Sequence, residues 1–329
     1  MTRVSPSTRR ALLLAALALS ASTVALDARA QAFPAKPIRI VVGFPPGNTL
    51  DTMARVLAEH LRVKLGQPVL VENKPGANGI LGATEVARAT PDGYTILCTN
   101  SSSIVVNPQI YKKLPYQTAE FAPLSMVISA PMILTVNPAN DRVASVNTMA
   151  DLMTLAKTKP ISYGSGGLGN LAHLGMEMVN NRAGVKTTHV PYKGAAAAQA
   201  GLLGREVDAQ FDTPLAVPLV KAGRLKALAV SGGTRLPDLP NVPTVAEAGY
   251  PGVDFTFWLG LLLPAQTPPA IVQTLYDAIR SVRDDPNAMK VLAQQGQVNL
   301  TDPAAFAERI RSEYALWGEV IKRENIQVD

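Results

Sequence analysis

The chain contains little of what metal binding and redox chemistry require. Its 329 residues include one cysteine and three histidines. Cys98 has no second thiol with which to form an internal disulfide, and it ends an apolar run, so we expect a small buried side chain on a strand. His60, His173 and His189 do not have the spacing of a zinc site. The sequence therefore predicts neither a metal site nor a cofactor.

Long apolar runs and long basic runs are also missing after the first 30 residues. The stretch 126–136 is interrupted by Ser129 and Pro131, and it is too short for the roughly 20 residues of a membrane-spanning helix. The net charge of +6 falls to +3 without residues 1–30, and the longest remaining basic runs are pairs. This excess is too small and too dispersed to predict binding to nucleic acid or to a membrane surface.

Residues 1–30 have the organisation of an export signal. A positive segment that ends at Arg10 precedes the apolar stretch 11–19, and the small-residue pattern Ala28-Arg29-Ala30 follows. A membrane anchor is the alternative, but Ser and Thr residues break the apolar stretch within 20–23. The pair Arg9-Arg10 also fits a twin-arginine signal, so the export route stays open. We expect cleavage after Ala30.

Apolar strands and amphipathic helices alternate along the remaining residues, and this alternation is typical of an α/β layered fold. The pattern predicts strands at 38–42, 69–72, 94–98, 132–136, 161–163, 187–190, 207–211, 227–230 and 258–263. It predicts helices at 49–65, 79–89, 149–157, 171–182, 195–203, 214–222, 270–282 and 303–323. Two strand-helix series follow one another, and the C-terminal part is left to pack on the first.

We therefore predict two lobes, each a mostly parallel sheet flanked by helices. Residues 31–131 and 251–329 are expected in the first lobe, and residues 132–250 in the second. In open α/β sheets, ligands bind beyond the carboxyl ends of the strands. The loops that follow the strands should consequently line a cleft between the lobes.

The first candidate site is the loop 44–51, between the first expected strand and the first expected helix. Its residues Gly47, Asn48 and Thr49 lie where a helix start leaves backbone N–H groups unpaired, and such a start favours an anion. The alternative is an ordinary helix cap, in which Asn48 or Thr49 caps the helix and Asp51 opposes its dipole. Both interpretations stay open.

The second candidate site is the loop 164–170, which also joins a strand to a helix. Its glycines match G-x-G-x-x-G, but a dinucleotide fold needs an acidic residue at the end of the next strand, and 187–190 contains none. Neither candidate loop contains Lys or Arg, so we expect backbone N–H groups and helix dipoles to hold a small carboxylate. The candidate residues of this loop are Ser165, Gly166, Gly167, Leu168, Gly169 and Asn170.

Further candidates follow other expected strands or open the helix after the second loop. Each of them has turn formation or packing as its alternative. These residues are Asn100, Ser101, Ser102, His173, Tyr192, Lys193, Gly194, Asp212 and Thr213.

Catalysis has little support in the sequence. No G-x-S-x-G elbow occurs, and no histidine lies in a recognisable triad pattern. A binding protein is favoured, with a secreted α/β enzyme that acts on a carboxylated substrate as the alternative.

Several motifs, in this order along the chain, resemble the Bug receptor family, the extracytoplasmic solute-binding proteins associated with tripartite tricarboxylate transporters. The resemblance covers essentially all of the chain after the leader. It rests on residues 37–42 (PIRIVV), 44–47 (FPPG), 51–55 (DTMAR), 91–95 (PDGYT), 163–165 (YGS), 173–174 (HL), 189–194 (HVPYKG) and 240–249 (PNVPTVAEAG).

The resemblance implies a two-lobed, type II-like periplasmic binding protein fold that closes on a small carboxylate. Di- and tricarboxylates, acidic amino acids and aromatic acids are the implied ligand classes. It also implies a periplasmic protein, expected to be a monomer, that works with the membrane components of a tripartite tricarboxylate transporter. One departure is Asn48, where family members commonly have a second glycine after Pro-Pro-Gly. This asparagine adds a side-chain amide to the anion loop.

Overall fold

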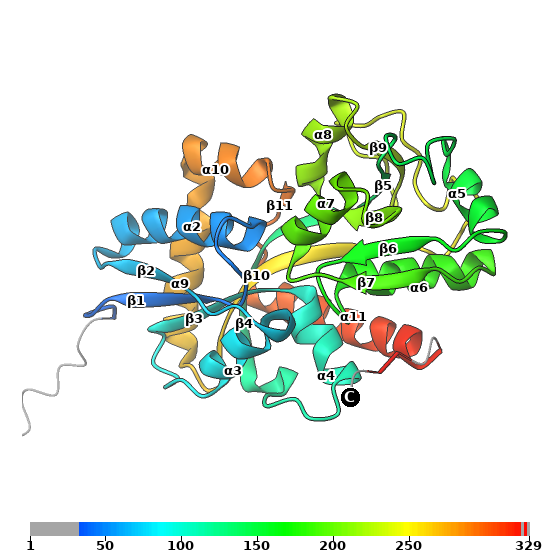
Figure 1. Cartoon of the computed structure of the whole chain (residues 1–329). Coiled ribbons are helices and arrows are strands. Elements are labelled where there is room, and N and C mark those ends of the chain that lie inside the picture. The colour runs from blue at the N-terminus through cyan, green and yellow to red at the C-terminus, as the bar shows by residue number, and fades with distance from the viewer. Residues whose placement is uncertain (1–32, 324–325, 328–329) are drawn as a thin grey trace, which may run out of the picture. The chain divides into compact units, whose positions relative to one another are not determined.

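The computed structural model describes residues 33–323 and 326–327 (Figure 1). The expected export signal and its cleavage after Ala30 lie outside these residues. The chain divides into two units, Met1–Ala35 and Lys36–Asp329, and the second holds all the elements discussed below. No helix in the part of the chain that the structure describes is long and apolar enough to cross a membrane.

The first sheet has six strands in the order β11-β4-β10-β3-β1-β2. The pairs β1–β2 and β1–β3 are parallel, whereas β10–β3, β10–β4 and β11–β4 are antiparallel. These strands are β1 (Ile38–Val42), β2 (Val69–Asn73), β3 (Thr95–Asn100), β4 (Phe121–Pro131), β10 (Thr256–Pro264) and β11 (Gln297–Val298).

The second sheet has five strands in the order β7-β6-β8-β5-β9. Here β6 runs parallel to β7 and β8, and β5 runs antiparallel to β8 and β9. These strands are β5 (Ile133–Val136), β6 (Ser162–Ser165), β7 (Thr188–Pro191), β8 (Ala209–Asp212) and β9 (Lys226–Val230).

The α/β two-lobed architecture agrees with the sequence prediction, but both sheets are mixed, not mostly parallel. The reversed strands are β10 and β11 in the first sheet and β5 in the second. Of these, β10 and β5 lie next to the points where the chain passes between the sheets. Strand direction is decided by where the chain comes from, and the apolar pattern of a buried strand does not carry that information.

Helices cover the faces of both sheets (Figure 1). Those that follow strands of the first sheet are α2 (Thr49–Leu65), α3 (Ile80–Ala87), α4 (Asn107–Ile110), α9 (Pro269–Arg280), α10 (Pro286–Ala293) and α11 (Pro303–Arg323). Those of the second are α5 (Met149–Ala156), α6 (Leu171–Ala183), α7 (Ala195–Leu203) and α8 (Val217–Lys221). The expected helix 214–222 is a 3-10 turn followed by α8. The strands β4 and β11 and the helices α4 and α10 were not predicted as elements.

The chain crosses between the sheets twice, and Ser231 ties the two crossings together. Met132 alone separates β4 from β5, and its N–H donates to Ser231 Oγ over 2.8 Å. The Ser231 hydroxyl in turn donates to the carbonyl of Phe255, over 2.6 Å, just before β10. Ser231 is fully buried. Ser231 therefore links the segment that leaves the first sheet to the segment that returns to it.

Candidate ligand-binding site

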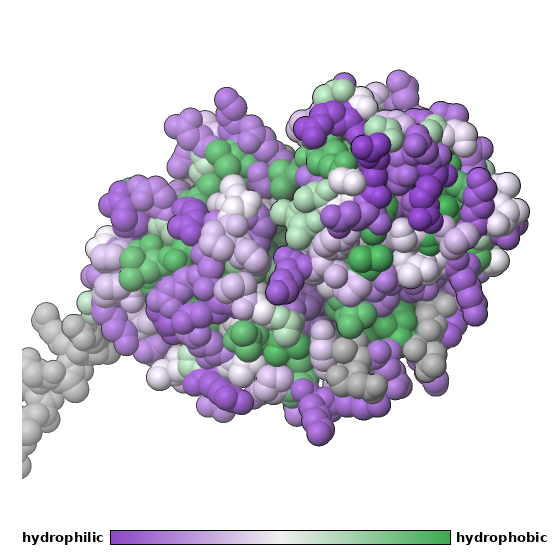
Figure 2. All heavy atoms as spheres, viewed as in Figure 1, coloured by the Kyte–Doolittle hydropathy of each residue, from purple (hydrophilic) through white to green (hydrophobic). Residues whose placement is uncertain are grey.

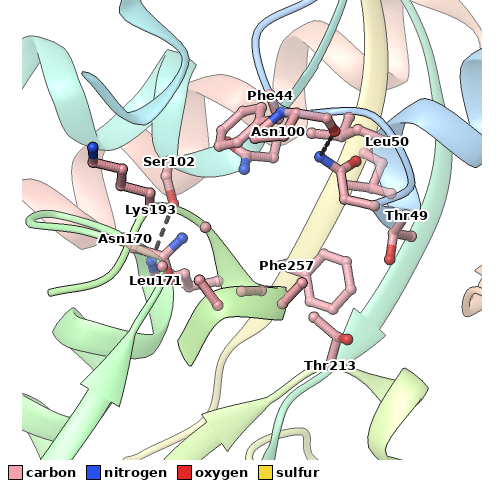
Figure 3. A pocket seen from close by; sticks show the side chains of 18 of the residues that line it. Phe44, Thr49, Leu50, Asn100, Ser102, Asn170, Leu171, Lys193, Thr213 and Phe257 are labelled. Atoms are coloured by element: carbon pink, nitrogen blue, oxygen red, sulfur yellow. Dashed lines mark hydrogen bonds between the residues drawn. The ribbon is translucent and has the colours of Figure 1, made fainter. Parts of the chain in front are cut away.

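A cavity of about 320 Å³ lies where the loops after the strands of both sheets meet (Figure 3). Its size is within the range of small-molecule sites. The first sheet contributes the loops after β1 and β3, the second those after β6, β7 and β8, and β10 supplies part of the wall. The lining residues are Phe44–Leu50, Asn100–Ser102, Met132, Gly166, Asn170, Leu171, Lys193–Ala197, Thr213, Phe257 and Leu259. In Figure 2 the visible face is hollowed between the lobes.

In the first candidate loop, Asn48 caps α2 and Thr49 faces the cavity. Asn48 Oδ1 accepts a 2.9 Å hydrogen bond from the N–H of Asp51, and Asn48 Nδ2 donates to the carbonyl of Pro45 over 2.7 Å. Thr49 is buried and lines the cavity, and its hydroxyl has no hydrogen-bond partner among residues 33–323. The loop therefore fits both interpretations, since Asn48 caps the helix and also lines the cavity, while the Thr49 hydroxyl is left unbonded beside it.

Asp51 does not line the cavity. Its carboxylate instead bonds to the loop 44–48 and to neighbouring side chains. It accepts hydrogen bonds of 2.9 to 3.0 Å from the N–H of Gly47, from Nε and Nη2 of Arg55 and from Nδ2 of Asn73. Burial acts to raise the pKa of Asp51, but the donors from Arg55, Gly47 and Asn73 together hold it below its usual range. The placement is that of a structural first-turn acid.

The residues after β3 reach the cavity, and one of them has an unused hydroxyl. Ser101 is fully buried and lines the cavity, and its Oγ has no partner in the described structure. Ser102 Oγ accepts a 3.1 Å hydrogen bond from the N–H of Leu171, the first residue of α6, and so joins the two sheets. Asn100 Oδ1 accepts from the N–H of Ser103 over 3.1 Å. A buried hydroxyl without a partner is expected to bond to a ligand or to water.

Of the second candidate loop, Gly166 and Asn170 line the cavity. Asn170 also caps α6, since its Oδ1 accepts a 2.9 Å hydrogen bond from the N–H of Ala172. Gly167 and Leu168 line an adjoining cavity of about 590 Å³, together with Tyr192, whose hydroxyl donates to Glu206 over 2.9 Å. Sequence reasoning placed the six candidate residues of this loop in one site, but of these only Gly166 and Asn170 line the cavity.

His173, Ser165 and Gly169 belong to a cluster beneath the same loop, outside the cavity. The rings of His173 and His189 stack with their centroids 4.0 Å apart, and His189 Nε2 lies 2.6 Å from Ser165 Oγ. The N–H of Gly169 donates to His173 Nδ1 over 3.2 Å. Burial lowers the pKa of His189 to about 3, with a further contribution from His173, and burial also lowers the pKa of His173. Both rings support the loop in their neutral form.

The cluster predicts a loss of stability in acid. A histidine whose folded-state pKa is depressed stabilises the fold above its ordinary value near 6.5, and this stability is lost between there and about 3. We expect the wild type to lose about 1 kcal/mol more than His189→Gln when the pH falls from 7 to 5. Urea unfolding of both proteins at the two pH values measures the difference. Parallel pH profiles would show that His189 is not held neutral.

Asp212 lies behind the cavity and not in its wall. It is buried, its Oδ1 accepts from Gln199 Nε2 and from the N–H of Thr213, each over 3.2 Å, and its Oδ2 has no partner in the described structure. Burial raises the pKa of Asp212 to about 7. Only the neighbour Thr213 lines the cavity. Asp212 therefore positions Thr213 and α7, because Gln199 belongs to that helix.

The start of α7 lines the cavity. Sequence reasoning reached Lys193 and Gly194 but missed the helix residues Ala195, Ala196 and Ala197 that follow them. Gly194 precedes the helix with φ 103° and ψ 164°, and no side chain caps it. The N–H groups of Ala195, Ala196 and Ala197 have no hydrogen-bond acceptor among residues 33–323. The absence of a capping residue could have pointed to this helix start. The sequence Lys193-Gly194-Ala195 opens a helix without Ser, Thr, Asn or Asp at the capping position.

The remaining wall of the cavity is apolar, and its charge is small. Among the described residues that line it, Lys193 is the single ionisable side chain, and it is exposed. In Figure 3 its amino group extends away from Phe257. The described lining thus carries no negative charge, and the α7 N–H groups and the Ser101 hydroxyl can donate hydrogen bonds, which suits an anion.

The sequence and the fold both match known transport receptors. Residues 53–326 match the family model described as tripartite tricarboxylate transporter family receptor. The chain is 33% identical to the protein BugT of Bordetella pertussis, over 95% of this chain and 97% of BugT.

Two solved structures from Rhodopseudomonas palustris share the fold. One, solved with adipate, is 30% identical over 90% of this chain and 99% of that chain, with a TM-score of 0.82. The other, MatC with bound malate, is 28% identical over 88% of this chain and 100% of that chain, with a TM-score of 0.80. The chain therefore belongs to the tripartite tricarboxylate transporter receptor family, and its fold is that of the two-lobed periplasmic binding proteins.

Proposed function

We propose that this protein is an extracytoplasmic solute-binding protein that captures a small carboxylate between its two lobes and delivers it to a membrane transporter. The observation that carries the proposal is the cavity itself. Loops of both sheets line it, and it contains unpartnered donors, the α7 N–H groups and the Ser101 hydroxyl. The relatives solved with adipate and with malate support a carboxylate as the ligand.

The predicted ligand residues that the proposal keeps are those that line the cavity. They come from both lobes, so that a bound carboxylate bridges them and favours a closed state. These residues are Gly47, Asn48, Thr49, Asn100, Ser101, Ser102, Gly166 and Asn170, to which the proposal adds Gly194, Ala195, Ala196 and Ala197.

The proposal includes the cellular setting. The protein is exported to the periplasm, its signal is cleaved after Ala30, and it acts as a monomer with the membrane components of a tripartite tricarboxylate transporter. The first lobe comprises residues 31–131 and 251–329, and the second comprises residues 132–250. The membership of β1–β4, β10 and β11 in one sheet and of β5–β9 in the other supports this division.

The geometry favours binding over catalysis. Ser165 and His189 are within hydrogen-bond distance of each other, as a nucleophile and its base would be, but Ser165 is fully buried. No carboxylate in the described structure bonds to the other nitrogen of His189, as a catalytic triad requires. The pair supports the loop 164–170 instead.

Calorimetry on a carboxylic acid and its methyl ester tests the proposal. A thermal-shift screen of carboxylic acids supplies the acid. Because the donors recognise an anion, we expect the ester to bind more weakly by about 2 kcal/mol or more. Equal affinities of acid and ester would contradict the proposal, and turnover of the acid would favour the enzyme alternative.

A further inference from the structure

We infer that the cavity holds a single carboxylate, at the start of α7, and that the rest of its ligand is uncharged and apolar. The ligand class is an apolar monocarboxylate, such as an aromatic acid with one carboxyl group. This inference rests on the proposed function and narrows it, because it excludes di- and tricarboxylates and amino acids as preferred ligands.

Three α-helices of eight residues or more, α2, α6 and α7, begin at the cavity, and the protein's own groups already occupy two of these starts. At α2, Asn48 caps the helix and Asp51 places a carboxylate in the first turn, bonded to the N–H of Gly47. At α6, the first N–H donates to Ser102 Oγ and the second to Asn170 Oδ1. A ligand anion at α2 would also lie close to the charge of Asp51, which opposes it.

The start of α7 is the open one. This helix has nine residues, no acid in its first turn and no side-chain cap, and Ala195, Ala196 and Ala197 all line the cavity. The Ser101 hydroxyl, fully buried in the same cavity and without a partner in the described structure, is a second and independent sign of a ligand. A carboxylate accepts up to four hydrogen bonds, so it has enough acceptor positions for the α7 N–H groups and the Ser101 hydroxyl.

The body of the ligand meets apolar side chains. Phe44 and Phe257 are each less than a tenth exposed, and both line the cavity. Figure 3 shows the ring of Phe257 between Thr213 and Leu50. The other apolar lining residues are Leu50, Met132, Leu171 and Leu259. Aromatic rings of the ligand would pack against such a wall in offset or edge-to-face geometry.

The described wall of the cavity contains no buried ionisable side chain that could pair with a second charge. No described lining residue is acidic, and Asp51 is fully engaged with Arg55, Asn73 and Gly47, so an ammonium group has no partner. A second carboxylate would lose its water without gaining a cation, since Lys193 is exposed at the edge. Burying an unpaired charge is unfavourable, and it selects against such ligands.

Matched acids that differ by one carboxyl group test the inference. The probes are benzoate against terephthalate and hexanoate against adipate, measured by calorimetry at pH 7 on the purified protein. We expect each monocarboxylate to bind at least tenfold more tightly than its dicarboxylate. Ser101→Ala should weaken both monocarboxylates about tenfold and leave the melting temperature of the ligand-free protein almost unchanged.

The outcome that overturns the inference is tighter binding of the dicarboxylates. Loss of that binding in Lys193→Met would then place the second carboxylate at the edge of the cavity, and the proposed function would stand. If no acid among the four binds better than its methyl ester, the proposed function falls, and the inference falls with it. Unaltered affinity of the monocarboxylates in Ser101→Ala would remove Ser101 from the carboxylate site and contradict the inference.

Discussion

Replacing Ala195 by proline is expected to weaken carboxylate binding at least tenfold while the helix α7 stays folded. Ala195 is the first residue of α7, where proline is well tolerated because its φ suits a helix and its N–H is not needed there. Gly194 has ψ 164°, which is compatible with a following proline. The substitution removes one backbone donor to a charged ligand, and such a bond contributes about 1.5 to 3 kcal/mol.

The matched control for this variant is Ala195→Val. Valine adds a side chain of similar bulk at the same exposed position but keeps the N–H group. Calorimetry with the best carboxylate from the screen, and melting curves without ligand, are measured for both variants. If valine and proline weaken binding equally, bulk is the cause, and if proline binds like the wild type, the carboxylate does not use the first N–H of α7.

Asp51→Ala is expected to lower the free energy of unfolding by about 2 kcal/mol, because it removes the one buried acceptor that the donors of Gly47, Arg55 and Asn73 share. The side chain of Asp51 is 6% exposed, and its carboxylate joins Gly47, Arg55 and Asn73 across the loop and the adjacent strand. Without it the loop 44–48 loses its anchor, so we also expect weaker ligand binding. Urea unfolding and calorimetry on the same variant measure the two effects.

The contribution of Asp51 to stability should depend on pH in a definite direction. The folded-state pKa of Asp51 is lowered, so its stabilisation is present above the ordinary value near 4 and is lost as the pH falls through the folded-state value. The wild type and Asp51→Ala should therefore converge in stability in strong acid. Glu59→Ala, which breaks the exposed pair with Arg62 in the same helix, is the control and should leave the melting temperature almost unchanged. A similarly small effect of Asp51→Ala would mean that the loop does not depend on this carboxylate.

Elements with strong local signals could be predicted from the sequence. The strand 38–42 and the helices 49–65, 195–203 and 303–323 have the expected bounds, because apolar periodicity and residues such as Gly66 define them locally. β4 was not predicted, since it is buried on both faces over much of its length and contains Pro123 and two serines. Its position depends on β10, which is more than 120 residues away in the sequence.

The sequence predicted the location of the cavity better than it predicted which side chains line it. The rule that ligands bind after parallel strands correctly brought residues 47–49 and 100–102 together at one cavity. It could not show that Asp51 would be engaged by Arg55 and Asn73, or that His173 would turn beneath the loop to stack on His189. The apolar wall from β10 was also invisible, because Phe257 reaches the cavity only through the sheet pairing.

The position of β10 determines when the first sheet can be completed during synthesis. Synthesis proceeds from the N-terminus, and all five strands of the second sheet lie between residues 133 and 230. β10 lies between β3 and β4, so these two strands of the first sheet have an unpaired edge until residues 256–264 have emerged. Such edges invite pairing with other chains, and a folding helper that shields them would protect the newly made protein. The cavity shares this timing, because Phe257 and Leu259 belong to its wall. The nascent chain thus acquires the ability to bind its ligand only after the second lobe has its complete sheet.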